Sequence, residues 1–262
     1  MDRENTHEIV ILDRKPDAAA IRRMVQEYFE SEAASYDRFN EGIDTRRRFI
    51  SVMNGLIARD LALHAPIETL LSVGCGTGFR EGDIRVRSGR PFTVAGVDFS
   101  ATMCAQARRA GLEAIESEWL DADLGGRQFD AAVYLYSLGL APTREARLAE
   151  LGKIARHLKA GAPFYVDVLN LDDRNEWGPE LRRLFVDRDL AAKGYDPGDV
   201  FYRRIGSNQL AYFHYFEEQE ACALLAESGF RIAGKQYIDC GRQVGELVGP
   251  QEGAILFMAR RR

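Results

Sequence analysis

The sequence contains no long apolar run. The longest purely aliphatic stretch near the N-terminus is Ile9 to Leu12, and no later stretch approaches the length of a membrane span. Four residues are also too few for the core of a signal peptide. We therefore expect no membrane partner, and we expect the protein in the cytoplasm.

Metal-binding and disulfide patterns are missing as well. The four cysteines, Cys75, Cys104, Cys222 and Cys240, lie far apart, with no CxxC pair and no histidine at metal-ligand spacing. This pattern predicts free thiols in a reducing compartment and no bound metal.

A strongly basic stretch is a third absence. The chain has 35 Lys+Arg against 40 Asp+Glu, a net charge of −5, and its arginine clusters at 46–48 and 260–262 are short. Nucleic-acid binders usually carry a basic stripe, so we expect no nucleic acid as partner. What the chain does have is 262 residues with 46% hydrophobic and 29% charged content, the composition of a globular protein of one or two domains. It carries no signal for an oligomeric state.

The N-terminal residues have the pattern of helices. Pro16-Asp17 is a start signal, and apolar residues from Ile21 to Phe29 then repeat at helical spacing. A second helix is predicted from Thr45 to His64, where Pro66 stops it. We expect these helices to form a cover, residues 1–68.

Short apolar strands alternate with helices from residue 69 onward. Strands are predicted at 69–73, 93–97, 114–116, 129–135, 164–168, 231–237 and 254–259. This alternation predicts an α/β fold with a parallel sheet covered by helices on both faces. The last two strands have no helix between them, so we expect them to pair antiparallel. Residues 79–85 are a poor helix, because Gly82 interrupts them.

Residues 170–214 break this rhythm. They are rich in charge and turn residues, and Gly206-Ser207-Asn208 joins two apolar runs, which predicts a hairpin. We therefore predict one domain, 1–262, in which 69–168 and 215–262 form the sheet and 170–214 an inserted lid.

The most informative stretch is Gly74-Cys75-Gly76-Thr77-Gly78, which follows the first strand of the sheet. Alternate glycines allow a ligand to approach the backbone at the carboxyl end of a strand. Asp98 ends the next strand, where a carboxylate accepts hydrogen bonds from ribose hydroxyls. The alternative is an aspartate that only caps the following turn.

Glu118-Trp119 follows the third strand and offers an acidic group beside a flat ring, which suits an adenine. The alternative is a half-buried tryptophan beside a solvated glutamate.

Three segments resemble successive motifs of class I S-adenosylmethionine-dependent methyltransferases of the small-molecule type. They are Gly74-Cys75-Gly76-Thr77-Gly78, Val97-Asp98-Phe99-Ser100-Ala101-Thr102-Met103 and Gln128-Phe129-Asp130-Ala131-Ala132-Val133. The resemblance implies a Rossmann-like, mostly parallel seven-stranded sheet with an antiparallel last strand, and S-adenosylmethionine as cofactor.

The same resemblance implies roles for individual residues. Gly74, Gly76 and Gly78, with Cys75 between them, would meet the methionine portion of the cofactor, which Tyr134 or its backbone would also approach. Asp98 would hold the ribose, with Phe99 and Met103 near the adenosine, and Glu118 and Trp119 would bracket the adenine. Tyr28 and Tyr36 resemble the arm that closes over the cofactor.

Candidates for the acceptor side lie in the predicted hairpin. His214 is a candidate base with Tyr212 on the same strand face, because side chains alternate along a strand. The alternative is a histidine packed among aromatics without a chemical role. Arg203 and Arg204 are candidate clamps for an anionic substrate, or simply a solvated face.

We conclude that the sequence predicts an enzyme that methylates an O, N or C atom of a small molecule, for example a specialised metabolite. Alternatives are a methyltransferase acting on a tRNA nucleoside or a protein, and a non-catalytic S-adenosylmethionine-binding partner protein. A nicotinamide-dependent dehydrogenase is disfavoured because the glycines lack GxGxxG spacing.

Overall fold

The fold is built around one mixed sheet. The computed structural model describes residues 7–34, 36–37, 44–64, 66–240 and 245–262. Seven strands form the sheet in the order β4-β3-β2-β5-β6-β10-β9. Their bounds are β2 (Thr69–Val73), β3 (Thr93–Asp98), β4 (Glu113–Glu116), β5 (Ala131–Tyr134), β6 (Pro163–Val168), β9 (Phe230–Ile238) and β10 (Ala254–Arg261). Strands β2 to β6 pair in parallel, and β10 runs antiparallel to both β6 and β9. The predicted fold class is confirmed.

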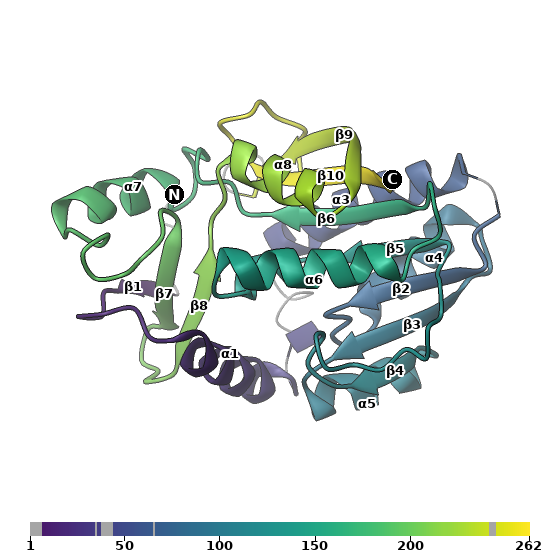
Figure 1. Ribbon diagram of the computed structural model, residues 1–262, viewed down its shortest axis with the longest axis horizontal. Helices are drawn as coiled ribbons and strands as arrows, with labels where there is room; N and C mark the ends of the chain where they lie inside the picture. Colours follow the sequence, from purple (N-terminus) through teal and green to yellow (C-terminus); the bar gives the residue numbers. More distant parts are fainter. Residues whose placement is uncertain (1–6, 35, 38–43, 65, 241–244) are drawn as a thin grey trace.

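Helices cover both faces of this sheet (Figure 1). On one face lie α3 (Asp44–Ala62), α4 (Phe79–Ser88) and α5 (Ala101–Arg109), whose apolar residues form a core with β2 and β3. On the other face lie α6 (Arg144–Arg156) and α8 (Glu218–Glu227), packed on β5 and β6. Ser100 and Thr143 cap α5 and α6 through their side chains, as their sequence position predicts. Helix α4 continues through Gly82, so the prediction of a poor helix was wrong there.

A second, smaller sheet joins the N-terminus to the segment predicted as an insertion. Strand β7 (Asp199–Arg204) pairs antiparallel with β8 (Leu210–His214), which confirms the predicted hairpin. Strand β1 (His7–Val10), which the sequence analysis did not predict, pairs with the other edge of β7. Helix α1 (Ala18–Glu32), capped by Asp17, packs against β8, and Figure 1 shows it beside this small sheet, to the left of the large one.

The remaining elements are short. They are α7 (Gly178–Asp187), which precedes β7, and a single 3₁₀ turn, η1 (Leu138–Leu140), which follows β5. Among the described helices, none is both long enough and apolar enough to cross a membrane.

Candidate functional site

The glycine loop and Asp98 meet where β2 and β3 end. The backbone N–H of Gly74 donates to the Val97 carbonyl at 2.8 Å, which ties the loop to β3. The carboxylate of Asp98 accepts from the N–H of Gly76 at 2.9 Å and from the N–H of Ser100 at 2.9 Å. The two motifs that the sequence placed 24 residues apart are therefore in direct contact.

Two positions of the loop favour glycine for different physical reasons. Gly76 has a φ of 52°, and a Cβ added there would meet no atom within 4 Å, so its α-carbon borders open space. Gly78 has a φ of 80°, and its Cβ would lie 2.9 Å from Cδ1 of Leu112, so this glycine permits close packing. Gly76 is thus the position at which a ligand can approach the backbone.

A cavity of about 870 Å³ begins at this loop. Gly74, Cys75 and Gly76 line one part of it, but the Cys75 side chain is buried, and burial raises the pKa of its thiol. Tyr28 and Tyr36, the residues predicted to form an arm over the cofactor, line it as well. Asp37, next to Tyr36, accepts a hydrogen bond from the Thr77 hydroxyl at 2.7 Å and joins this segment to the glycine loop.

Glu81 is a residue of this cavity that the sequence analysis missed. It lies in the first turn of α4 with only 4% of its surface exposed, and one carboxylate oxygen accepts from the Ser72 hydroxyl at 2.6 Å. The other oxygen is buried without a hydrogen-bond partner, and burial raises the pKa of the carboxyl. Its signal in the sequence was a glutamate three residues after Gly78 and three before the apolar Ile84, on the inner face of the helix.

These features fit S-adenosylmethionine. A buried carboxylate oxygen without a donor suits an ammonium such as that of an amino acid, because such a pair satisfies both charges. The open space at Gly76 accommodates a chain lying across the strand end. A carboxylate also has more lone pairs than the two that Asp98 uses on backbone groups, which leaves capacity for hydroxyls.

Helix α1 closes the side on which the adenosine portion was predicted. The Gln26 amide donates to the Glu118 carboxylate. Glu30 of the same helix accepts from the hydroxyls of Ser100 and of Thr102, the latter at 2.6 Å. Neither Asp98 nor Glu118 is among the residues that line the cavity.

Phe99 and Met103 are placed by the same helix cap. The Phe99 ring lies 6.3 Å from that of Phe29 in α1, and Met103 is buried with its N–H on the capping Ser100. Both residues are close to Asp98 in the sequence, but neither is among the residues that line the cavity.

The predicted role of the Trp119 ring needs correction. It is 7% exposed, its indole N–H donates to the Glu150 carbonyl at 3.0 Å, and Lys153 Nζ lies 4.6 Å from the ring centroid. Because these groups from α6 enclose the ring, it belongs to the core and offers no face to an adenine.

The Tyr134 side chain is likewise directed away from the cavity. Its hydroxyl donates to a carboxylate oxygen of Glu150 at 2.5 Å, and burial raises the pKa of that carboxyl to about 7. The next residues, Leu135 and Tyr136, do line the cavity. Tyr136 has a φ of 56°, rare for a tyrosine, and its N–H donates to the buried Asp167 at 2.6 Å.

His214 and Tyr212 lie on the face of β8 that points away from the cavity. His214 is 1% exposed, and its two ring nitrogens face Asp199 at 2.8 Å and Glu220 at 3.1 Å. The Tyr212 hydroxyl donates to the same oxygen of Asp199 at 2.6 Å. Because carboxylates occupy both nitrogens, His214 has no site at which to accept a substrate proton, and we withdraw the prediction of a catalytic base there.

The two arginines of the predicted clamp separate. Arg203 is on the outer surface and pairs with Glu8 at 2.5 Å. Arg204 lines the cavity and pairs with Glu32 at 2.9 Å. Successive strand residues point to opposite faces, so only one of the pair can reach a bound molecule.

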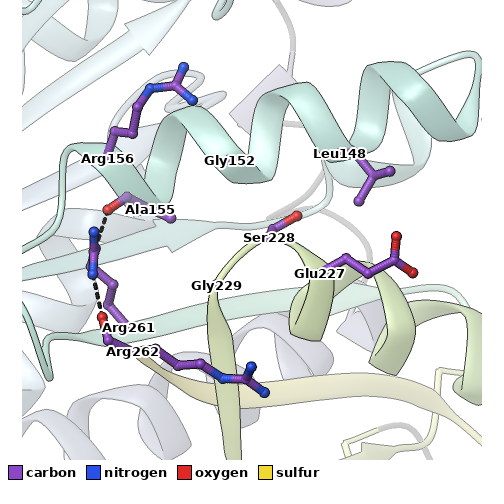
Figure 2. Close-up of a pocket in the computed structure, with 9 residues that line it drawn as sticks. All are labelled: Leu148, Gly152, Ala155, Arg156, Glu227, Ser228, Gly229, Arg261 and Arg262. Carbon is purple, nitrogen blue, oxygen red and sulfur yellow. Dashed lines mark hydrogen bonds between the residues drawn. The ribbon is translucent and has the colours of Figure 1, made fainter.

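A second cavity, of about 500 Å³, lies between α6, the end of α8 and the C-terminal strand (Figure 2). Arg261, one of its lining residues, is engaged with the Ala155 carbonyl at 2.5 Å. The cavity contains none of the residues predicted for the site. Within the described part of the chain, no cluster of three or more His, Cys, Asp or Glu residues is placed to hold a metal ion.

Comparison with known proteins agrees with this geometry. A family model described as a methyltransferase domain matches residues 70–161. The chain is 27% identical over 219 residues to a cypemycin N-terminal methyltransferase from a Streptomyces species, covering 78% of this chain and 88% of the relative. The fold, the glycine loop and these matches identify the chain as a class I S-adenosylmethionine-dependent methyltransferase, and S-adenosylmethionine is its cofactor.

Solved structures share the fold over most of its length. One is the 1,6-didemethyltoxoflavin-N1-methyltransferase of Burkholderia thailandensis, with a TM-score of 0.61 and 15% identity, covering 97% of this chain and 94% of that one. Another is a sugar N-methyltransferase from a Streptoalloteichus species, with a TM-score of 0.57 and 20% identity, covering 87% and 92%.

Proposed function

We propose that this enzyme methylates a small molecule. The observation that carries the proposal is the single cavity of about 870 Å³ that runs from the glycine loop to aromatic residues of β7 and β8. That volume is within the range of small-molecule sites. The similar proteins named above for a toxoflavin precursor and a sugar support the same class of acceptor. The net charge of −5 favours such an acceptor over nucleic acid.

The residues of the chain act by binding and orientation. The cofactor supplies an activated methyl group on a sulfonium, so the protein contributes chiefly by holding the acceptor in line with it. Gly76 and Glu81 would hold the amino-acid portion and Asp98 the ribose. Tyr136, fixed by Asp167, would border the space next to the reacting atoms. His214 does not serve as a general base, because Asp199 and Glu220 face both of its ring nitrogens.

Isothermal titration calorimetry with S-adenosylhomocysteine tests the proposal. Wild type should bind, and Asp98→Ala should bind at least tenfold more weakly, while Asp187→Ala, a surface carboxylate on α7, should bind as wild type does. If the folded wild type does not bind S-adenosylhomocysteine, the proposal is refuted. Methyl transfer to total RNA but not to a metabolite extract would overturn the class of acceptor.

For the compartment we propose the cytoplasm. All four cysteines are free, including the buried Cys75 and Cys104. Proteins of oxidising compartments more often pair their cysteines, which supports a reducing environment.

A further inference from the structure

Six aromatic residues, each in ring contact with the next, line the part of the cavity next to β7 and β8. The ring centroids of Tyr28 and Tyr202 are 5.9 Å apart, those of Tyr202 and Trp177 5.7 Å, and those of Trp177 and Tyr215 6.4 Å. The series continues from Tyr215 to Phe213 at 6.3 Å and from Phe213 to Tyr136 at 5.3 Å. We call this set the aromatic wall: Tyr28, Tyr136, Trp177, Tyr202, Phe213 and Tyr215.

The tyrosine hydroxyls of the wall are neutral and open to a ligand. Burial raises the pKa values of Tyr136, Tyr202 and Tyr215 above that of free tyrosine. All three residues line the cavity. They can therefore accept hydrogen bonds from a bound molecule.

The charge next to the wall is negative at one end. Glu176 precedes Trp177, lines the cavity, and is close enough to Tyr215 for its charge to raise the pKa of that hydroxyl. Arg46 also lines the cavity, and its charge lowers the pKa values of Tyr136 and Tyr202, whereas Arg204 is paired with Glu32. The Trp177–Tyr215 end thus combines ring faces with a carboxylate.

This combination is selective for cations. Ring faces carry partial negative charge and attract ammonium groups, most strongly where water is excluded. A carboxylate beside them adds direct attraction, whereas a phenolate or carboxylate substrate would meet like charge at Glu176.

We infer that the acceptor is an amine, held at the aromatic wall with its nitrogen between the ring faces and Glu176. The inference rests on the proposed function and specifies its substrate class. To react, the nitrogen must be neutral, so the bound ammonium must first lose a proton. The released proton passes to the Glu176 carboxylate. The nitrogen lone pair then forms the new N–C bond, and the electron pair of the broken C–S bond remains on sulfur.

The wall also accepts the methylated product. Each transfer replaces an N–H by a methyl group, and methylated ammonium groups still bind well between aromatic faces. A primary amine should therefore receive more than one methyl group.

Choline and its neutral isostere 3,3-dimethylbutan-1-ol test the binding of the cation. The two have the same shape and differ in one central atom, N⁺ or C. With S-adenosylhomocysteine at saturation, calorimetry should give choline a Kd at least tenfold lower than that of the isostere. Trp177→Leu should remove this preference, Trp177→Phe should retain part of it, and Tyr237→Leu, on β9 outside the cavity, should leave it unchanged.

The outcomes separate this inference from the proposed function. Equal binding of the two probes, or binding of neither while S-adenosylhomocysteine binds normally, overturns the amine acceptor alone. Failure of S-adenosylhomocysteine to bind overturns the proposed function itself. In transfer assays we expect methylation of benzylamine and not of phenol or benzoate, and the reverse result refutes the inference. Transfer to a peptide amino terminus but to no small amine would refute the small-molecule source.

Discussion

Removal of the Asp199 carboxylate is the sharpest test of what fixes the small sheet to the rest of the molecule. Asp199 is 4% exposed and accepts hydrogen bonds from Tyr212 at 2.6 Å and from the Asp196 N–H at 2.8 Å, and it lies 2.6 Å from Lys15 Nζ. His214 and Arg147 complete its surroundings. Asp199→Ala leaves several buried polar groups without their partner. We therefore expect it to lower the free energy of unfolding by about 3–5 kcal/mol.

The pH dependence of stability follows from the same contacts. Burial acts to raise the pKa of Asp199, but the hydrogen bonds and charges of His214 and Lys15 together outweigh it and lower that pKa to about 2 from its ordinary 3.8. A depressed pKa means that the carboxylate stabilises the fold above pH 3.8 and that this contribution is lost as the pH falls toward 2. The lowered pKa corresponds to a contribution of about 2 kcal/mol to the free energy of unfolding. Asp199→Asn should therefore lack this part of the acid sensitivity of the wild type.

Urea unfolding followed by circular dichroism measures both effects. The matched control is Asp187→Ala, whose carboxylate makes an exposed i,i+4 pair with Arg183 at 3.1 Å and should change stability by less than about 1 kcal/mol. If Asp199→Ala costs no more than the control, the buried charges do not hold the small sheet in place, and our account of this network is wrong.

Three further predictions concern the cofactor site. Gly76→Ala should weaken S-adenosylhomocysteine binding at least tenfold in calorimetry. It should cost about 1–2 kcal/mol of stability, since only the left-handed backbone conformation opposes an alanine there. Gly78→Ala should cost more stability than Gly76→Ala, because its Cβ collides with Leu112. Glu81→Gln should weaken binding about tenfold by removing the partner of an ammonium. Because the raised pKa of Glu81 lets the folded state retain a proton, stability of the ligand-free wild type should fall relative to Glu81→Gln as pH rises above 4.5, which thermal unfolding at several pH values would detect. Tyr134→Phe should cost about 1–3 kcal/mol of stability by removing the hydrogen bond to Glu150. It should leave the Kd of S-adenosylhomocysteine within twofold of the wild-type value. A larger effect on binding would show that Tyr134 belongs to the cofactor site.

The large sheet was predictable because its signals are local. Ser100 and Thr143 mark helix starts next to the residues that they cap, and the glycine loop follows its strand directly. Strand β1 has no such signal: four residues become a strand only because β7, about 190 positions later, offers a free edge. The continuation of α4 through Gly82 has a similar cause, because packing outweighs the low helix propensity of one glycine.

The candidate site shows where a sequence pattern stops being informative. Alternation assigned Tyr212 and His214 to one face of β8 and Phe213 and Tyr215 to the other, and the structure has that arrangement. Which face meets the cavity depends on how the hairpin packs, and Arg147 of α6 and Glu220 of α8 lie behind His214. Local sequence contains no information on that choice.

The contacts of α1 have a consequence for how the cofactor enters. Gln26 hydrogen-bonds to Glu118, and Glu30 hydrogen-bonds to Ser100 and Thr102. These are the polar groups around the predicted nucleoside position. An incoming nucleoside therefore competes with the protein's own helix, and the free energy of displacing α1 is subtracted from its affinity. Loosening this helix would tighten cofactor binding, whereas product release would be assisted each time the helix returns to its own partners.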